Sequence, residues 1–568
     1  MFQCSYITEK KSFTTKEHNR QGTFQQDTNI HTCLESLSRS TCVGELNQDI
    51  AVAHLERNRS TMTETVTIQP SIEVIKECIA ANDDSINMYP VYHFMPAMDL
   101  TPHVAYLKLS QLNKKDRSAS FLFESAIGNQ LGRFSFFGQG PRKTIKTGPT
   151  EGLSCDPLDI LQQELSQYKL AENVPGLPKL SGGAIGYVSY DCVQYFEPKT
   201  KREMKDTLQL PEAALMLYDT IVAFDHVFQR FQIMYNINIK EVESLEKGYE
   251  EATEVINRIA SILKDDSQPV PLPEQPPIKM DQTFTSNIGE EGYIQHVKTL
   301  KEHIKKGDII QCVPSQRVAR PTSLHPFNIY KHLRTVNPSP YMFYIDYLDF
   351  QIIGASPELL CQVDSKNEVI THPIAGTIKR GATPAEDDKL AEELRSSTKD
   401  RAEHVMLVDL ARNDINRVCD PKTTSVDKLL TVQKFSHVQH LVSQVSGTLR
   451  PDQTRFHALR SIFPAGTVSG APKVKAMELI AELEGEKRGV YAGAVGHWSY
   501  DGKSMDTCIA LRTMVYKNGT AYLQAGGGIV FDSDEHDEYI ETMNKMKANH
   551  QTILQAEELW AKKVGIQK

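Results

Sequence analysis

The sequence lacks every paired-cysteine motif. Its ten cysteines stand far apart and no two form a Cys-x-x-Cys pair, which argues against zinc ribbons and thioredoxin-type chemistry. A disulfide-stapled secreted protein would carry its cysteines more densely, and no apolar signal segment stands at the start. We therefore expect free thiols in a reducing, cytoplasmic environment.

An excess of positive charge and long apolar runs are also missing. Lysine and arginine number 63 against 72 aspartates and glutamates, a net charge of −9, so no nucleic-acid-binding patch is indicated. No uncharged stretch approaches the roughly 20 apolar residues that a membrane-spanning helix requires. With 40% hydrophobic residues, the chain of 568 can bury a large core. We expect neither nucleic acid nor a membrane as a partner.

Composition divides the chain into four parts. Residues 1–61 are rich in Ser, Thr, Asn and Gln and carry as many acidic as basic residues, which predicts a disordered leader rather than an Arg-rich targeting peptide. A region at 62–263 contains a predicted hairpin, Thr220–Phe224 with Phe228–Tyr235. Five prolines between 264 and 283 exclude a helix or a central strand, although such a connector can also cross the surface of one body. The remaining region is 284–568.

The last region mixes helical and strand-like patterns. Apolar residues at helical spacing predict a helix over 294–304 that ends at Gly307, a second over 385–412 and a third from Pro472. Strand-like runs are 309–318, 341–347 and 350–354. Because strands and helices cluster rather than alternate, the pattern favours an α+β fold.

Two predicted helices each present a pair of carboxylates. Glu538, Glu541 and Lys545 are spaced i, i+3, i+7 and so share a helix face, and Asp400 and Glu403 are spaced i, i+3. Facing helices of this kind can hold Mg²⁺, which takes a few carboxylates with substrate oxygens and water. Surface salt bridges explain the same spacing, and the spacing does not decide between them.

Glycine-bearing loops follow two strand-like runs, at Gln524–Ile529 and Pro373–Thr377. The first can form an anion-binding concavity of backbone N–H groups, or simply a strand corner. It lacks the Lys-Ser/Thr end of a P-loop and the spacing of a dinucleotide fingerprint. Gly466-Thr-Val-Ser-Gly470 has the wrong order for a serine nucleophile elbow. The residues thus indicate a magnesium site beside a carboxylate-binding loop, without a covalent nucleophile.

Seven motifs in order resemble those of chorismate-utilising enzymes, and in particular of anthranilate synthase large subunits of the fungal type. The resemblance covers the chain after about Met62. The motifs are Pro373-Ile-Ala-Gly-Thr377, Asp400-Arg-Ala-Glu-His404, His440-Leu-Val-Ser443, Gly466-Thr-Val-Ser-Gly-Ala-Pro-Lys473, Asp506-Thr-Cys-Ile-Ala-Leu-Arg512, Gln524-Ala-Gly-Gly-Gly528 and Glu538-x-x-Glu-x-x-x-Lys545. The fold that this implies is two antiparallel sheets stacked as a sandwich with helices outside, both halves of the chain contributing.

The implied activity is that of a lyase at the first step of tryptophan biosynthesis. Chorismate is aminated with ammonia at C2, loses its C4 hydroxyl and then eliminates pyruvate to give anthranilate. Related enzymes carry a lysine where this chain has Ala375 (aminodeoxychorismate synthases) or Gln311 (isochorismate and salicylate synthases). The alternatives are an aminodeoxychorismate synthase and a non-catalytic subunit that binds tryptophan.

The resemblance also implies a role for each residue of the site. The cofactor is Mg²⁺, held by Glu403 and Glu541, with Asp400 and Glu538 as supports behind them. Glu358 is the acid that protonates the departing hydroxyl, and His440 assists pyruvate elimination. The substrate-binding set is Gly376, Thr377, Thr467, Tyr491, Arg512, Gly526, Gly527, Gly528 and Lys545.

A second, regulatory site is implied in the 62–263 region and its partner segment. Phe121-Leu-Phe-Glu-Ser-Ala126 and Asn337-Pro-Ser-Pro-Tyr-Met-Phe343 resemble segments that bind L-tryptophan as feedback inhibitor, through Ser125, Pro340, Tyr341 and Met342. Taken alone, the first segment is equally a core strand. No cysteine lies in a Gly-x-Cys-x-Gly elbow, so ammonia is expected from a separate glutamine amidotransferase subunit.

Overall fold

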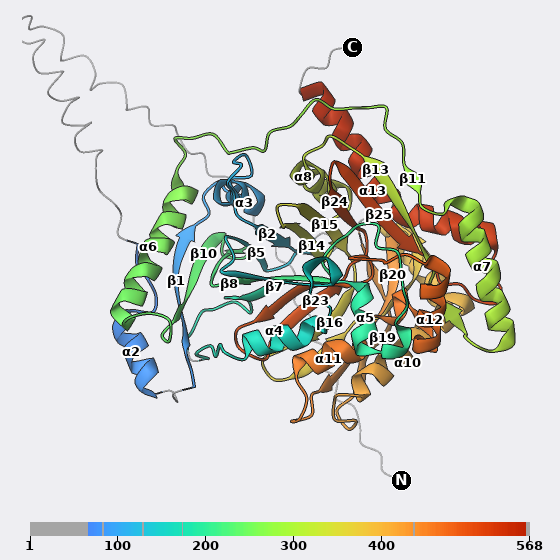
Figure 1. Cartoon of the computed structure of the whole chain (residues 1–568), viewed down its shortest axis with the longest axis horizontal. Coiled ribbons are helices and arrows are strands. Elements are labelled where there is room, and N and C mark those ends of the chain that lie inside the picture. The colour runs from blue at the N-terminus through green and yellow to red at the C-terminus, as the bar shows by residue number, and fades with distance from the viewer. Residues whose placement is uncertain (1–65, 82–84, 128–129, 173, 436–437, 564–568) are drawn as a thin grey trace, which may run out of the picture. The chain divides into compact units, whose positions relative to one another are not determined.

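A computed structural model describes residues 66–81, 85–127, 130–172, 174–435 and 438–563. Residues 66–568 form one compact unit, and Figure 1 labels its elements. The predicted leader at 1–61 lies outside the described residues. In the part of the chain that is described, no helix is both long enough and apolar enough to cross a membrane.

Eleven strands of the described chain form the first sheet, and every pairing in it is antiparallel. In spatial order they are β1 (Met88–Pro96), β10 (Arg230–Asn238), β9 (Thr220–Asp225), β5 (Phe134–Gln139), β2 (Ser120–Glu124), β14 (Tyr341–Asp346), β15 (Phe350–Ser356), β24 (Thr513–Lys517), β25 (Thr520–Gly526), β13 (Ser315–Pro321) and β11 (Thr285–Ser286). The predicted hairpin is the β9–β10 pair. Phe228 lies outside it, because the Asp225 carboxylate accepts hydrogen bonds from the Val227 and Phe228 N–H groups and forms a turn there.

The second sheet is antiparallel as well. Its order is β18 (Ile374–Lys379), β20 (Val438–Thr448), β17 (Glu368–Thr371), β16 (Leu359–Val363), β23 (Met505–Ile509), β22 (Ala494–Ser499), β7 (Gly183–Val188), β8 (Ala213–Tyr218) and β6 (Lys143–Thr147), with β19 (Ser425–Lys434) also paired to β20. Two short pairs are β12 (Gln311–Cys312) with β21 (Gly470–Ala471), and β3 (Ala126–Ile127) with β4 (Gln130–Leu131).

The two sheets pack face to face around a shared core. The ring of Tyr187 in β7 lies 5.8 Å from that of Tyr347, which follows β14. The Tyr347 hydroxyl donates to the carbonyl of Ala214 in β8 at 2.8 Å. Buried side chains of both sheets, such as Phe121 and Met216, belong to one hydrophobic cluster. The predicted α+β sandwich of antiparallel sheets is therefore confirmed.

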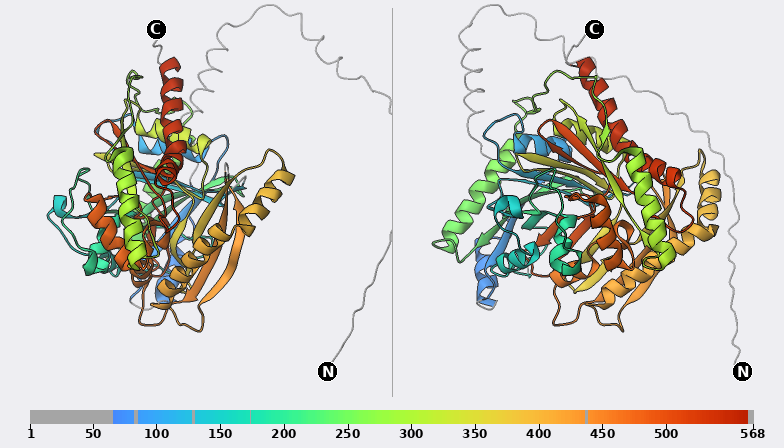
Figure 2. Two further views of the ribbon diagram at one scale, coloured as in Figure 1. Left: turned by 90° about the vertical axis from the view of Figure 1, so that its right-hand side faces the viewer. Right: turned by 45° about the vertical axis from the view of Figure 1, so that its right-hand side comes forward.

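Helices cover the outer faces, and Figure 2 shows the long C-terminal helix α13 beside α7. The helices are α2 (Ile72–Ala81), α3 (Pro102–Ser110), α4 (Pro157–Leu165), α5 (Val193–Phe196), α6 (Leu245–Lys264), α7 (Gly289–Lys306), α8 (Pro326–Val336), α9 (Pro384–Ser396), α10 (Thr398–Asn416), α11 (Arg455–Ile462), α12 (Lys473–Glu484) and α13 (Glu535–Lys563). The predicted stop of α7 is confirmed, since Gly307 adopts a left-handed φ of 81° there.

Two expected elements are divided in the structure. The helix predicted over 385–412 is two helices, α9 and α10, because Ser397 leaves helical geometry and its side chain caps the first turn of α10 at the Asp400 N–H. The strand predicted over 309–318 is split into β12 and β13 around Pro314, whose nitrogen has no hydrogen to donate to a ladder.

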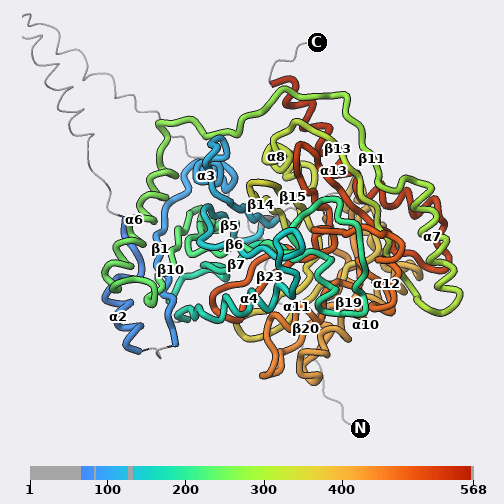
Figure 3. Tube along the Cα trace, in the orientation of Figure 1, coloured from blue at the N-terminus to red at the C-terminus, as the bar shows by residue number. Residues whose placement is uncertain are grey.

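The proline-rich connector runs between α6 and β11 without helix or strand. In Figure 3 its trace passes from α6 across the top of the view towards β11 and α7. Strands from before and after the connector join both sheets. The candidate site can therefore draw on segments that lie hundreds of residues apart in the sequence.

Candidate active site

Glu358 lies in the short link between β15 and β16. Its side chain is only 3% exposed, and its Oε1 accepts a hydrogen bond of 2.7 Å from the Thr467 hydroxyl. Burial raises the pKa of this carboxyl to about 8, although the Thr467 hydroxyl and the Arg512 charge act to lower it. Glu358 consequently keeps its proton near neutral pH, the state that a general acid needs.

His440 stands on β20 opposite Thr377 of β18. Its Nδ1 lies 2.9 Å from the Gly376 carbonyl oxygen, which only accepts, so Nδ1 carries the proton. The Thr377 hydroxyl is 3.1 Å from the same nitrogen. Burial lowers the pKa of His440 to about 4. The ring is therefore neutral, with the lone pair of Nε2 available as a base.

Gly376 allows β18 to approach α10 closely. Its φ of 68° is left-handed, and a Cβ at this position would lie 2.9 Å from Oδ1 of Asp400. The register of β18 against β20 shifts between Ala375 and Thr377. This bulge turns the Gly376 carbonyl towards His440 and leaves room for the acidic face of α10.

The carboxylates of α10 and α13 meet at the triple-glycine loop. A Cβ on Gly528 would lie 3.1 Å from Oε1 of Glu403, and one on Gly527 would lie 2.8 Å from Oε2 of Glu538. Burial raises the pKa of Glu403, and the nearby charges of Glu541 and Asp400 raise it further. Two acids 138 positions apart in the sequence are thus electrostatic neighbours.

Each of these acids already has a partner on one oxygen. Gln311 Nε2 donates to Glu403 Oε1 at 2.7 Å, and Lys545 Nζ lies 2.7 Å from Glu541 Oε1. Glu538 Oε1 accepts from the Ser533 hydroxyl at 2.6 Å, whereas its buried Oε2 has no hydrogen-bond partner within the described residues. Among those residues, no group of three or more His, Cys, Asp or Glu side chains is arranged to hold a metal.

The glycine loop itself differs from an open nest of N–H groups. Gly527 N–H donates to the Tyr293 hydroxyl at 3.1 Å, and Lys545 Nζ donates to the Gly526 carbonyl at 2.9 Å. Burial raises the pKa of Tyr491, and a backbone hydrogen bond with Gly526 acts to lower it. Sequence reasoning missed Tyr293, because its place on the buried face of α7 reads as an ordinary core position.

Arg512 and Tyr491 complete this side of the site. Arg512 follows β23 with a left-handed φ of 49°, and Tyr491 is 7% exposed. Burial lowers the pKa of Arg512, against the effects of Tyr491, Glu358 and Glu541. The guanidinium is therefore near enough to Glu358 and to Glu541 of α13 for both charges to act on it.

The four residues predicted for tryptophan lie together at a second place. Met342 of β14 pairs with Glu124 of β2, so Ser125 comes directly beyond this pair and beside Tyr341. The Tyr341 hydroxyl donates to Asp506 Oδ1 at 3.1 Å, and Pro340 precedes it at the start of the strand. The structure thus gathers the predicted catalytic set at one position and the predicted regulatory set at another.

Comparison with known proteins identifies relatives along most of the chain. The family described as chorismate binding enzyme matches residues 118–551. Anthranilate synthase component 1 of Saccharomyces cerevisiae is 76% identical over 506 residues, which cover 89% of this chain and 100% of the yeast protein. Probable anthranilate synthase component 1 of Schizosaccharomyces pombe is 56% identical over 495 residues, 87% of this chain and 98% of that protein.

Solved structures agree with this assignment. Anthranilate synthase component I from Streptococcus pneumoniae superposes with a TM-score of 0.64 at 36% identity, over 80% of this chain and 98% of that one. The menaquinone-specific isochorismate synthase of Escherichia coli, 20% identical over 89% of this chain and 99% of that one, shares the fold with a TM-score of 0.63. The chain therefore belongs to the chorismate binding enzyme family and, within it, to the anthranilate synthase component 1 proteins.

Proposed function

We propose that this chain converts chorismate and ammonia to anthranilate, with release of water and pyruvate. The observation that carries the proposal is the protonated, buried Glu358 in one site with a neutral His440 and the guanidinium of Arg512. Ammonia adds at C2, the C4 hydroxyl leaves as water, and removal of the C2 proton with cleavage of the C3–oxygen bond releases pyruvate.

Glu358 supplies the proton for the departing hydroxyl. Burial keeps the carboxyl neutral, and the Thr467 hydroxyl fixes its Oε1. His440 takes up the C2 proton at Nε2, since Nδ1 is committed to the Gly376 carbonyl. Acid and base are thus separate groups whose environments move their pKa values in opposite directions.

Substrate binding follows from the charge of chorismate, a dicarboxylate. Arg512 binds the enolpyruvyl carboxylate through two parallel hydrogen bonds, with Tyr491 beside it. The loop Gly526–Gly528 and Lys545 receive the ring carboxylate, where the Gly527 N–H must exchange Tyr293 for the substrate or share it. Gly376 and Thr377 line the ring.

The donor set fits Mg²⁺. Glu403 and Glu541 would offer hard oxygen ligands, and Oε2 of Glu538, which is buried and has no hydrogen-bond partner among the described residues, would stand behind them. Mg²⁺ needs only one or two protein carboxylates when substrate and water fill its other positions. When bound, the ion supplies Lewis-acid polarisation of the ring carboxylate and fixes its orientation.

Three further properties belong to the proposal. Tryptophan binds at Ser125, Pro340, Tyr341 and Met342, where apolar and aromatic walls suit an indole. Ammonia comes from a glutamine amidotransferase subunit, in keeping with the designation of the relatives as component 1. The described cysteines are all free thiols, which fits a reducing cytoplasm.

The test is turnover of chorismate by the purified chain with ammonium and MgCl₂, followed by anthranilate fluorescence and by pyruvate release. Equal amounts of anthranilate and pyruvate are expected, with loss of both on chelation of magnesium. An aminated product that retains its enolpyruvyl group would instead identify an aminodeoxychorismate synthase. No turnover, with tryptophan still bound, would identify a regulatory subunit.

A further inference from the structure

Arg488 is a buried cation for which the proposed chemistry has no use. It lies between α12 and β22 and is 1% exposed. Its Nε and Nη2 contact the two carboxylate oxygens of Glu484 at 2.9 and 2.7 Å, a two-pronged ion pair. Its Nη1 donates to the Val468 carbonyl at 2.9 Å and its Nη2 to the Val313 carbonyl at 2.7 Å. The guanidinium thus ties three separate segments together.

Each carbonyl that Arg488 binds belongs to a segment that carries part of the site. Val468 follows Thr467, whose hydroxyl holds Glu358. Val313 and Pro314 back the glycine loop, because a Cβ on Gly526 would lie 2.4 Å from the Pro314 carbonyl oxygen and 3.2 Å from the Val313 side chain. A shift of the guanidinium would therefore move both the support of the acid and the floor of the loop.

The same side chain also contacts the third part of the site. Its guanidinium carbon lies 5.6 Å from the ring centre of Tyr491 and 4.4 Å from that of Tyr190.

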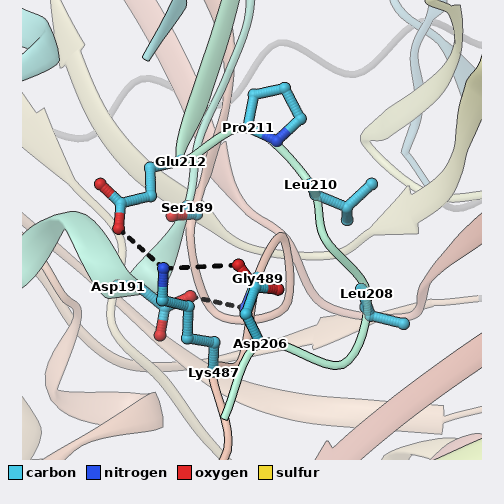
Figure 4. Close-up of a pocket in the computed structure, with 9 residues that line it drawn as sticks. All are labelled: Ser189, Asp191, Asp206, Leu208, Leu210, Pro211, Glu212, Lys487 and Gly489. Carbon is cyan, nitrogen blue, oxygen red and sulfur yellow. Dashed lines mark hydrogen bonds and ion pairs between the residues drawn. The ribbon is translucent and has the colours of Figure 1, made fainter. Parts of the chain in front are cut away.

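The backbone at Arg488 is fixed as well. The Asp191 carboxylate accepts from the N–H groups of Arg488 and Gly489 at 3.2 and 2.7 Å. Figure 4 shows the Asp191–Gly489 contact beside Lys487, which is held by Glu212 at 3.0 Å.

A buried ion pair is a costly way to obtain stability alone, since well-packed apolar residues often serve equally well. What a planar guanidinium adds is a fixed fork of donors that a lysine cannot reproduce. We infer that Arg488 is a positioning residue, which holds Thr467, Tyr491 and the glycine loop in one geometry around the reacting ring. This inference rests on the proposed function.

The experiment compares Arg488→Lys with Arg320→Lys in the full chain, with chorismate, ammonium and MgCl₂ as probe. Arg320 is a matched control: it is 2% exposed, pairs with Glu557 at 2.5 Å, donates to the Gln282 carbonyl and stacks over Phe284. For Arg488→Lys we expect kcat to fall about 10- to 100-fold, the cost of a misplaced catalytic group. The basic limb of its pH profile should move to higher pH, because loss of the Thr467 contact raises the pKa of Glu358.

Arg320→Lys should lower the melting temperature and leave both kcat and the pH limb in place. Equal behaviour of the two variants, or an unmoved limb in Arg488→Lys, would overturn the inference. Should Arg488→Lys not fold, Glu484→Gln removes the charge that orients the guanidinium and must move the limb in the same direction. If the unaltered chain makes no anthranilate, the proposed function fails first, whatever the variants do.

Discussion

The candidate active site takes its side chains from segments spread between residues 293 and 545, whereas the predicted tryptophan pocket is formed by two neighbouring strands of one sheet. In the first, burial shifts the pKa of an acid up to about 8 and of an imidazole down to about 4. In the second, the key contacts are apolar walls and one tyrosine hydroxyl on Asp506. Catalysis requires charges gathered from both sheets, while recognition of an indole requires one shaped surface.

The two regions adjoin one another in the fold. Tyr341 pairs directly with Ser356 of β15, two residues before Glu358. The Ser356 hydroxyl donates to the Ile509 carbonyl at 2.6 Å, in the strand that leads to Arg512. Variants that affect only one region therefore measure how independent the two are.

The largest difference between the effect on turnover and the effect on tryptophan binding is expected for Glu403→Gln. An amide is a poorer ligand for Mg²⁺ than a carboxylate and removes a negative charge, so magnesium-dependent turnover should be abolished while tryptophan still binds. Anthranilate fluorescence across a MgCl₂ titration measures the first, and calorimetry with tryptophan the second. Glu393→Gln, exposed on α9, is the control. Retained activity in Glu403→Gln would refute the metal assignment.

Glu358→Gln should lower kcat by about 10²- to 10⁴-fold, the usual contribution of a general acid, because the amide cannot deliver a proton. Tryptophan binding should again be unchanged. Glu368→Gln, at an exposed position of β17, controls for the loss of a carboxylate elsewhere in the same sheet. A variant with normal kcat would show that another group protonates the hydroxyl.

The pH dependence of turnover tests the role of Glu358 as general acid in a second way. Because the active form of Glu358 is protonated and its pKa is about 8, kcat/KM should fall as pH rises through about 8. The folded chain also holds a proton that the unfolded carboxyl loses near 4.5, so the contribution of Glu358 to the free energy of unfolding should decrease as pH rises from about 4.5 to about 8.

Two variants check this assignment. Thr467→Val should move the fall in kcat/KM to higher pH, because the Thr467 hydroxyl stabilises the charged form of Glu358 and its loss raises the pKa of that carboxyl. Glu358→Gln should remove only the Glu358 contribution, so the difference in unfolding free energy between the unaltered chain and this variant, measured by urea titration, should change between about pH 4.5 and about pH 8. If the fall in kcat/KM stays at the same pH in Thr467→Val, a group other than Glu358 causes it.

The smallest effect on catalysis is expected at Ser125. In Ser125→Leu the larger side chain crowds Gly132, where an added Cβ would already lie 2.6 Å from Cβ of Ser125. The tryptophan concentration for half-inhibition should rise about tenfold or more, within the usual range of coupling between two sites, at unchanged kcat. Ser118→Leu, exposed before β2, is the control. Unaltered tryptophan sensitivity would place the pocket elsewhere.

Local pattern was enough to predict several elements correctly. Apolar spacing and Gly307 defined α7, and the alternating residues after Thr220 defined a hairpin. It was insufficient where one polar residue or proline interrupts a continuous pattern, as Ser397 does between α9 and α10 and Pro314 between β12 and β13. Whether a side chain such as that of Ser397 caps a helix depends on the backbone conformation at that residue, and the spacing of apolar residues carries no information about this conformation.

The i, i+3 spacing of Asp400 with Glu403 and of Glu538 with Glu541 placed each pair on one helix face, but equally allowed surface salt bridges. Motif resemblance selected the magnesium interpretation. Only the fold brought Glu403 and Glu538 to the same glycine loop and the charge of Glu541 close to Glu403. It also added Tyr293 and Arg488, which carry no local signal at all.

The sequence by itself determined the α+β class, the antiparallel hairpins, the motifs of the family and the residue types able to do acid–base chemistry. Tertiary structure alone decided which of those residues act on one another and in which protonation state. The physical reason is that a pKa and a hydrogen bond depend on burial and on neighbours within a few ångströms, and in this protein those neighbours come from distant parts of the chain.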